Sequence, residues 1–338
     1  MSGSVGKKKF GVGIIGCGLI GGKRAAALGK GASLIACADI NLDRAEKLAS
    51  NYDAGALSDW RELLKIPQVE IVIVATLHDS LAQITLAALE AGKHVLVEKP
   101  GARNMGELDA VMEAANRANK KVHVGFNHRY HRSLRKAKEI FDSGSIGELM
   151  FIRARYGHGG RLGYDKEWRS DPRLSGGGEL IDQGPHLIDL SRWFLGDFSE
   201  VQGYAHTYYW DMPVDDNGFM LLKTSKNQVA FLHASCTEWK NLFSMEIYGK
   251  EGKLDLFGLG GSYGVEKLTL FRMLPQMGPP ETISWEYPMA DDSWAVEMNE
   301  FYEDILLDRK PSSGLNDSYQ ALKIINQIYK DSGYDHSA

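Results

Sequence analysis

The chain has 338 residues, of which 43% are hydrophobic and 10% aromatic, a composition typical of a globular protein of about two domains. Lys and Arg total 39 and Asp and Glu total 44, so the formal charge is −5, which argues against nucleic acid as the main partner. The three cysteines, Cys17, Cys37 and Cys236, give no sign of a disulfide framework or a zinc cluster, so we expect a cytoplasmic protein.

Residues 1–127 alternate short, β-branched runs with helical patterns. The pattern predicts strands at 10–15, 33–39, 71–75, 94–97 and 122–126, and helices at 19–28, 43–52, 60–64, 81–91 and 107–119. Such alternation predicts an α/β domain with a doubly wound parallel sheet. The apolar run after lysines 7–9 is too short for a signal peptide, and no segment approaches the roughly 18 apolar residues of a membrane span. We therefore expect no membrane partner.

Residues 128–338 have a different pattern. A first helix and a glycine-rich loop precede strand-like runs at 149–157, 201–209, 218–222, 228–236, 243–248, 253–257, 265–272 and 282–287, and helices are predicted at 294–308 and 318–330. Polar turns join several neighbouring runs into hairpins. The second domain is therefore predicted to be α+β, with a mostly antiparallel sheet.

The segment from Gly16 to Gly21 fits the pattern GxGxxG directly after a predicted strand and at the start of a helix. Its glycines allow a tight turn and a close approach to a pyrophosphate, which the helix N-terminus attracts. The predicted cofactor-binding residues of this loop are Gly16, Gly18, Leu19, Ile20 and Gly21.

Asp39 ends the second predicted strand, 18 residues beyond Gly21. A carboxylate at about this spacing binds the ribose hydroxyls of a dinucleotide and repels a 2′-phosphate, so NAD is favoured over NADP. Thr76 and His78 follow the third strand and are expected to line the cofactor groove, although His78 could instead cap the next helix.

Glu98, Lys99 and Pro100 follow the apolar run at 94–97, at the sheet edge where ligands bind in open α/β folds. The proline ends the strand and stiffens the turn that carries the lysine. Lys99 is therefore a candidate catalytic group, and Glu98 a candidate cofactor contact or ion-pair partner.

A second candidate segment runs from Gly176 to Asp189 and contains three consecutive glycines, which we interpret as allowing close approach to a ligand. Pro185 is well placed to begin a helix, so Asp182 would precede that helix and His186 would lie in its first turn. A histidine can take the hydroxyl proton as hydride leaves an alcohol, while Lys99 stabilises the alkoxide. Asp189, one turn further on, is predicted to form a packing or salt-bridge contact.

These motifs, together with Gly125-Phe126-Asn127 and Trp168-Arg169, resemble those of the Gfo/Idh/MocA family of glucose-fructose oxidoreductases and inositol dehydrogenases. The resemblance covers residues 9–332. It implies a Rossmann domain followed by an open-sheet domain, a catalytic trio of Lys99, Asp182 and His186, and assembly as a homodimer or homotetramer.

The resemblance also places Asn127, Trp168 and Arg169 near the nicotinamide or the substrate. Tyr156, His158 and Arg161 are further candidates for substrate binding, although the loop of His158 and Arg161 could equally be a solvated or subunit-contact segment. The histidines His123, His128 and His131 have no acidic or cysteine residue beside them in the sequence, so we predict no metal site.

The resemblance therefore favours an NAD-dependent dehydrogenase that oxidises a secondary hydroxyl of a sugar, sugar derivative or cyclitol to a ketone. Two alternatives stay open. One is a redox-neutral, NAD-retaining glycoside hydrolase on the same scaffold, and the other is a dinucleotide-binding regulator without catalytic activity.

Overall fold

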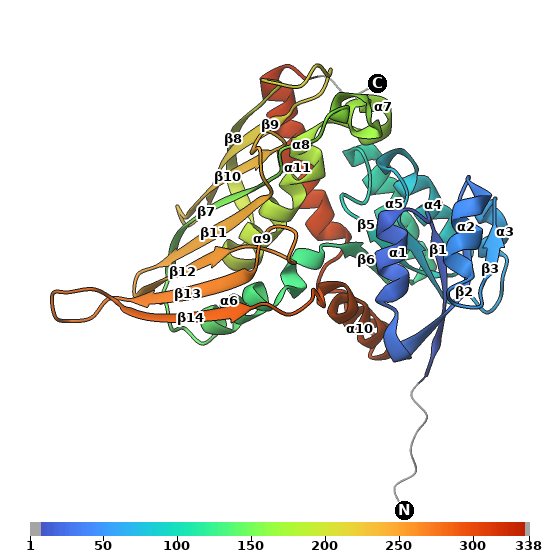
Figure 1. The fold of residues 1–338 in the computed structure, drawn as a ribbon, viewed down its shortest axis with the longest axis horizontal. Helices are drawn as coiled ribbons and strands as arrows, with labels where there is room; N and C mark the ends of the chain where they lie inside the picture. The colour runs from blue at the N-terminus through green and yellow to red at the C-terminus, as the bar shows by residue number, and fades with distance from the viewer. Residues whose placement is uncertain (1–7, 335–338) are drawn as a thin grey trace, which may run out of the picture. The chain divides into compact units, whose positions relative to one another are not determined.

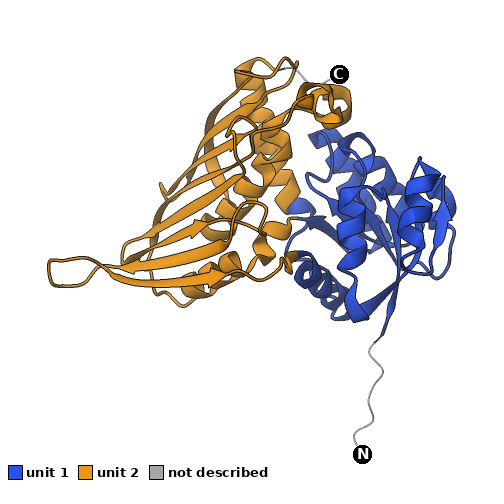
Figure 2. Cartoon of the chain, viewed as in Figure 1, with its two compact units in different colours: residues 1–125, 294–316 blue, residues 126–293, 317–338 orange. Residues whose placement is uncertain are grey.

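The computed structural model describes residues 8–334 and divides into two compact units (Figures 1 and 2). Unit 1 contains the chain up to Gly125 together with Trp294–Asn316, and unit 2 contains Phe126–Ser293 together with the chain from Asp317. The sequence assigned residues 1–127 to one domain and 128–338 to the other, so residues 126–127 and 294–316 are the differences. Lys7, the first of the three consecutive lysines 7–9, lies outside the described residues. Within the described part of the chain, the helices lack the combination of length and apolarity that crossing a bilayer requires.

Unit 1 is built on a six-stranded parallel sheet with the strand order β3-β2-β1-β4-β5-β6, which confirms the predicted doubly wound sheet. All residues of the central strands β1 and β4 are buried, as expected when both faces of a parallel sheet are covered. Strand β3 was missed because it has only three residues. The strands are β1 (Phe10–Ile15), β2 (Ala32–Ala38), β3 (Gly55–Leu57), β4 (Ile71–Val74), β5 (His94–Glu98) and β6 (Val122–Gly125).

The helices of unit 1 follow these strands in alternation (Figure 1). They are α1 (Leu19–Ala26), the 3₁₀ turn η1 (Gly29–Gly31), α2 (Leu42–Ala49), α3 (Trp60–Leu64), α4 (His78–Glu90), α5 (Met105–Ala118) and α10 (Ser293–Leu306).

Helix α10 belongs to unit 1 because its apolar side chains complete the core of that unit. Met298 and Phe301 are fully buried in a cluster that also contains Phe10, Leu34 and Ile71. The sequence could not show this, since the eight strands of unit 2 separate the helix from β1 along the chain.

Unit 2 is built on an eight-stranded sheet with the order β14-β13-β12-β11-β7-β10-β9-β8. Every neighbouring pair is antiparallel except β7 and β10, which confirms the predicted, mostly antiparallel sheet. The strands are β7 (Leu149–Gly157), β8 (Phe198–His206), β9 (Asn217–Thr224), β10 (Val229–Ser235), β11 (Leu242–Gly249), β12 (Gly252–Phe257), β13 (Glu266–Arg272) and β14 (Glu281–Tyr287).

Helices of unit 2 pack against one face of this sheet, with α9 on β7 and β10, and α6 on β13. Strand β11 accordingly alternates buried and half-buried residues along its length. The other helical segments are short, apart from α11. The helical segments are η2 (Asn127–Tyr130), α6 (Arg132–Asp142), η3 (Tyr164–Lys166), η4 (Trp168–Ser170), α7 (Pro172–Ser175), α8 (Glu179–Asp182), α9 (Gly184–Leu195) and α11 (Leu315–Ser332).

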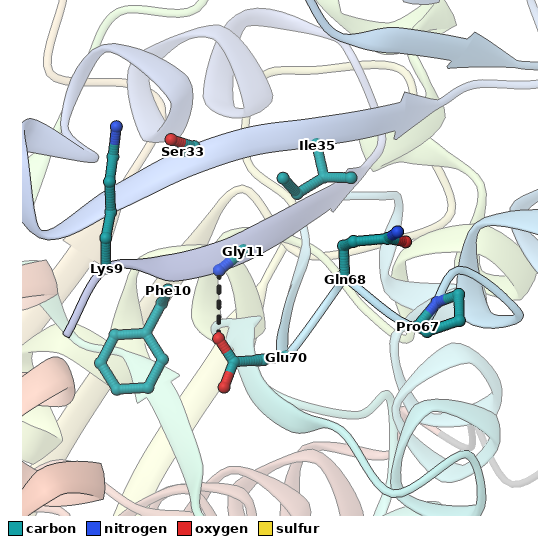
Figure 3. Close-up of a pocket in the computed structure, with 8 residues that line it drawn as sticks. All are labelled: Lys9, Phe10, Gly11, Ser33, Ile35, Pro67, Gln68 and Glu70. Atoms are coloured by element: carbon teal, nitrogen blue, oxygen red, sulfur yellow. Dashed lines mark hydrogen bonds between the residues drawn. The ribbon is translucent and has the colours of Figure 1, made fainter.

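A shallow pocket of about 460 Å³ lies at the amino ends of β1 and β2, lined by residues that include Lys9, Ser33 and Gln68 (Figure 3). There the Gly11 N–H donates to Glu70 Oε2 at 3.3 Å. Ligands of doubly wound sheets bind at the opposite edge, beyond the carboxyl ends of the strands. The candidate active site is therefore expected at that edge.

Candidate active site

The glycine-rich loop between β1 and α1 has the geometry that a dinucleotide requires. Gly16 has φ +94°, and a Cβ there would overlap the backbone of Ala75, while a Cβ on Gly21 would overlap the carbonyl of Gly16. A Cβ added to Gly18 would meet nothing within 4 Å. Two glycines therefore serve the tight turn and the close packing of the helix, and the exposed Gly18 leaves open space where a pyrophosphate would lie. The glycine-rich loop therefore fits the pyrophosphate of NAD.

Leu19 and Ile20 follow Gly18 at the start of α1, and Leu19 is 78% exposed. An exposed leucine in the first turn presents an apolar surface beside the free N–H groups of the helix. Both residues lie where the sequence analysis expected a cofactor contact.

Asp39 lies directly after β2 and bonds to the glycine-rich loop. Its Oδ2 accepts from the Cys17 N–H at 2.8 Å, and its Oδ1 accepts from the Asn41 N–H at 2.9 Å. The carboxylate therefore also orients the loop, a role that the sequence did not reveal.

Thr76 and His78 follow β4 at the same sheet edge. Thr76 is half-buried, and its Oγ1 donates to the Leu77 carbonyl at 3.3 Å. His78 is buried and is the first residue of α4, whereas Leu77 occupies the N-cap position with no side-chain cap bond. The alternative that His78 caps this helix is therefore wrong.

Glu98 ends strand β5 and forms an ion pair with a fully buried arginine of α1. Arg24 Nε donates to Glu98 Oε1 at 2.6 Å, and its Nη1 donates to Glu297 of α10. Burial raises the pKa of Glu98, since it outweighs the opposing effect of the Arg24 charge. Burial also acts to raise the pKa of Glu297, but Arg24 and His123 outweigh it and lower that pKa. The sequence left two roles open for Glu98, a cofactor contact or an ion pair. The structure shows the ion pair.

Lys99 is the first residue after β5 and is half-buried. The Lys99–Pro100 peptide bond is cis, and the Gly101 N–H donates to the Glu98 carbonyl at 2.9 Å. The lysine thus lies on a hydrogen-bonded turn at the carboxyl edge of the sheet in unit 1. The other two members of the expected trio, Asp182 and His186, lie in unit 2.

Asp182 is the last residue of α8 and is held by Arg169. The Arg169 Nε donates to Asp182 Oδ2 at 2.9 Å, and the guanidinium also lies over the ring of Trp168 at 4.6 Å. The charge of Asp182 is the main reason that the pKa of Arg169 is raised. The structure therefore joins the Trp168-Arg169 pair to Asp182, which the sequence had proposed separately.

His186 lies in the first turn of α9 and is 4% exposed. Its ring stacks on the ring of His128 at 3.6 Å between centroids, and Tyr156 meets both rings edge-on, at 6.0 Å and 4.9 Å. Burial raises the pKa of Tyr156, and the charge of Asp182 adds to this effect. Tyr156 is therefore close to both candidate catalytic residues of unit 2.

His128 is a neighbour of His186 that the sequence considered only as a metal ligand. Among residues 8–334, no group of three or more His, Cys, Asp and Glu side chains has the arrangement to hold a metal ion. His123 Nε2 lies 3.2 Å from Glu297, and His131 Nδ1 lies 2.7 Å from Glu266. His123 and His131 thus each have an acidic partner, but that partner comes from a distant part of the chain.

Two of the three glycines before α8 lie close to protein atoms. A Cβ on Gly177 would overlap the Tyr329 hydroxyl, and one on Gly178 would overlap the backbone of Asp215. Asp215 accepts the N–H groups of Gly178 at 2.9 Å and Leu180 at 2.7 Å, and burial raises its pKa to about 6. Gly177 and Gly178 therefore make room for this buried carboxylate and for Tyr329.

The remaining predicted residues lie in different surroundings. Asn127 is buried and its Nδ2 donates to Ser293 Oγ at 3.2 Å. His158 Nε2 lies 3.6 Å from Glu179 Oε1, whereas Arg161 is 73% exposed and pairs with Glu167 at 2.7 Å. His158 thus belongs to the buried part of the site, and Arg161 lies at its surface. Glu179, 2% exposed, belongs to the Gly176–Asp189 segment but was not among the residues predicted there.

Two family models match the chain. Residues 10–126 match the oxidoreductase family with an NAD-binding Rossmann fold, and residues 134–255 match the GFO/IDH/MocA C-terminal domain. The chain belongs to the Gfo/Idh/MocA family. Unit 1 is accordingly an NAD-binding Rossmann domain.

Curated relatives in the Gfo/Idh/MocA family are sugar and cyclitol dehydrogenases. Levoglucosan dehydrogenase of Pseudarthrobacter phenanthrenivorans is 32% identical over 190 residues, which cover 55% of this chain and 49% of that protein. Myo-inositol 2-dehydrogenase of Thermotoga maritima is 29% identical over 260 residues, which cover 74% of this chain and 73% of that protein. The match thus spans about half the length of the first of these relatives.

The structural similarity to solved proteins covers more of the chain than the sequence similarity does. A solved structure of levoglucosan dehydrogenase in complex with NADH covers 96% of this chain and 97% of its own, with a TM-score of 0.88 and 24% identity. At this identity the likeness establishes the fold of both units.

Proposed function

We propose that this protein is an NAD-dependent dehydrogenase that oxidises a secondary hydroxyl of a sugar, sugar derivative or cyclitol to a ketone. The observation that carries the proposal is the cluster in unit 2, where buried His186 and buried Asp182 are each fixed by a neighbouring side chain. Together with the NAD-binding unit, this cluster supplies a proton acceptor and a polar group for orienting a hydroxyl. The named activities of the relatives support the same reaction class.

Each residue has a defined task in this reaction. The Gly16–Gly21 loop and Asp39 would hold NAD, which would supply the acceptor for the carbinol hydride. His186 takes the hydroxyl proton, Asp182 held by Arg169 orients a substrate hydroxyl, and Lys99 stabilises the negative charge that develops on the oxygen. Loss of one hydride and one proton converts the alcohol to the ketone.

The test is NADH formation with a panel of sugars, cyclitols, sugar phosphates and nucleotide sugars. We expect turnover with at least one polyol, and we expect Lys99→Met and His186→Asn each to lower kcat by about 10²- to 10⁴-fold. Lys30→Met, which removes an exposed lysine from the same unit, is the matched control. Hydrolysis of aryl glycosides without net NADH would favour the hydrolase instead, and NAD binding with no turnover would favour the regulator.

We also propose that the protein assembles as a homodimer or homotetramer. The face of the unit 2 sheet that bears Tyr204, Leu221 and Phe231 is exposed, at 72%, 45% and 49% for these side chains. Sedimentation velocity tests the proposal, and a monomer at micromolar concentration would contradict it.

A further inference from the structure

Two buried histidines of unit 2 lie face to face. His128, in η2, and His186, in the first turn of α9, have ring centroids 3.6 Å apart and ring planes 18° from parallel. Their side chains belong to residues that are only 5% and 4% exposed. The ring of His128 therefore covers one face of the proton acceptor assigned above.

This stack determines the plane of the His186 ring. Phe126 and Tyr156 meet that ring edge-on, at 6.1 Å and 6.0 Å between centroids. The ring of His128 is bordered in the same way, by Tyr156 at 4.9 Å and by Phe243 at 6.1 Å. A ring that is covered on one face and bordered at its edges cannot turn freely, because a close-packed interior resists reorientation. The nitrogens of His186 thus keep a fixed direction, which a general base requires for proton transfer.

The two imidazoles are also coupled through their charges. Two positive charges about 4 Å apart repel each other, most strongly where water is excluded. The uptake of protons is then a property of the pair of rings and not of either ring alone. A proton on His128 would therefore oppose the transfer of a second proton to His186.

The charged groups of α8 favour a single positive charge on the stack. The charge of Asp182, above all, and that of Glu179 raise the pKa of Arg169, so two buried carboxylates share one guanidinium. His158 adds no positive charge at neutral pH, because burial lowers its pKa, and its Nδ1 accepts the Gly160 N–H at 2.9 Å. One negative charge is left over in this group, which balances one proton on the stack but not two.

A third histidine borders the stack next to His128. The ring of His131 lies 5.7 Å from that of His128, and its Nδ1 lies 2.7 Å from Glu266 Oε1 and 3.6 Å from Asp291 Oδ1. A positive charge on His131, held by these carboxylates, disfavours a second one on His128. The single proton of the stack is thereby directed to His186.

The other titratable groups around the stack are neutral or paired. Burial, above all, raises the pKa of Tyr156 and that of Tyr263, whose hydroxyl groups are hydrogen-bonded to each other, so both phenols keep their protons. Arg129, beside His128 in η2, donates from Nε to Asp189 of α9 at 2.7 Å. These groups do not compete with His186 for the substrate proton.

We propose that His128 is a positioning residue for His186, and that the stacked pair takes up one proton as a unit. The proposal rests on the proposed function, in which His186 is the proton acceptor, and adds the residue that orients this acceptor and limits its charge. As the substrate loses its hydroxyl proton to His186 and its carbinol hydride to NAD, the pair passes from no charge to one positive charge.

The kinetic test compares three substitutions of His128 with a polyol that the wild type oxidises. His128→Ala removes the stacked ring and should lower kcat by about tenfold or more, whereas His128→Phe keeps a flat ring and should restore most of it. His128→Arg places a permanent charge on the same face of His186. Because this charge opposes protonation of His186, the acid limb of kcat/KM should lie about one to three pH units lower than in His128→Phe.

The matched control is His206→Phe, which replaces an exposed histidine of β8 and should leave both kcat and the pH profile unchanged. Three results would each overturn the proposal. They are wild-type kcat in His128→Ala, equal losses of kcat in His128→Ala and His128→Phe, and the same acid limb in His128→Arg and His128→Phe.

A measurement on the wild-type protein needs neither turnover nor a folded variant of His128. Histidine labelled with ¹³C at Cε1 reports the protonated fraction of each ring by NMR, and His186→Asn assigns one signal of the pair. Between about pH 9 and pH 5 we expect the protonated fractions of His128 and His186 to add up to one. Two complete and independent titrations, or no proton uptake by either ring, would overturn the proposal. One shared proton in a protein that oxidises no polyol would support the coupled pair and refute only the proposed function.

Discussion

Arg24 donates from Nε to Glu98 Oε1 at 2.6 Å, with the arginine side chain fully buried and the glutamate 11% exposed. This ion pair joins the helix that follows the glycine-rich loop to the residue before Lys99. Gly125, opposite Glu98 on the neighbouring strand, leaves room for it, because a Cβ there would lie 2.6 Å from Arg24 Nη2. Two of the chain's sequence motifs are therefore connected through one side chain.

Arg24→Met is expected to destabilise unit 1, because Glu98 would stay buried without its arginine and Glu297 would keep only His123 as a partner. Leaving buried charges uncompensated costs about 3–5 kcal/mol, measurable as a lower urea midpoint. Adding Glu297→Gln to Arg24→Met should recover part of the loss, because one of the two charges is then removed. Arg44→Met, at an exposed position of α2, is the control. An unchanged urea midpoint for Arg24→Met would show that the ion pair contributes nothing.

Gly18→Ala is expected to weaken NAD binding while the protein stays folded. The added Cβ meets no protein atom within 4 Å, but it occupies the space that a pyrophosphate would approach. We expect the NAD Kd to rise by about tenfold or more, equivalent to about 1.4 kcal/mol, with no loss of thermal stability. Gly22→Ala, one turn further along α1 and also in open space, should leave the NAD Kd unchanged. Equal NAD affinities of the two variants would contradict the placement of the pyrophosphate.

Asp39→Ser is expected to shift the cofactor preference from NAD towards NADP. It removes a negative charge that would repel a 2′-phosphate, and it loses hydrogen bonds to the ribose worth about 1–2 kcal/mol, or about five- to thirtyfold in NAD affinity. Asp39→Asn is the informative comparison, since its amide oxygen can still accept one of the N–H groups of Cys17 and Asn41. Calorimetric titration with both cofactors gives the result. A ratio of NAD to NADP affinity that stays constant in both variants would mean that Asp39 serves only to shape the loop.

Glu266 is expected to make unit 2 sensitive to acid. Burial alone would raise its pKa, but hydrogen bonds from His131, Ser133 and Gly260 and the charge of His131 lower it to about 2, from an ordinary value of 4.5. A depressed pKa contributes stability that is complete above about pH 4.5 and is lost as the pH falls towards 2. The difference of about 2.5 pH units corresponds to roughly 3 kcal/mol.

Urea unfolding of Glu266→Gln at several pH values checks this. The stability difference from the wild type should be largest at pH 5 and above and should shrink as the pH falls towards 2. The control is Glu286→Gln. Glu286 is an exposed residue of β14 that pairs with Lys267, and its substitution should show no such trend. A constant difference between Glu266→Gln and wild type at every pH would mean that the residue acts through packing.

The sequence predicted those features that depend on short stretches of chain. The parallel sheet, the glycine-rich loop, Asp39 after β2 and the helix beginning near Pro185 all follow from local periodicity and spacing. The predicted ion-pair or packing role of Asp189 is also confirmed, since Arg129 donates to its carboxylate with both groups buried.

The contacts that could not be predicted join distant parts of the chain. Arg24 and Glu297 are 273 residues apart, and His131 and Glu266 are 135 apart. Only the fold determines that such groups meet. The glycines before α8 illustrate the same limit, because a glycine looks alike in sequence whether it faces a ligand or, as here, Tyr329 and Asp215.

Helix α10 also bears on how the protein folds during synthesis. The core around Phe10 and Leu34 lacks Met298 and Phe301 until the ribosome has made all eight strands of unit 2. Unit 1 therefore cannot mature first, in contrast to the usual order in which an amino-terminal domain folds before the rest is made. A nascent chain that stops short of residue 294 would carry the dinucleotide loop on an unfinished, aggregation-prone sheet. Truncation before residue 294 should thus destabilise unit 1, which begins at the amino-terminal end of the chain.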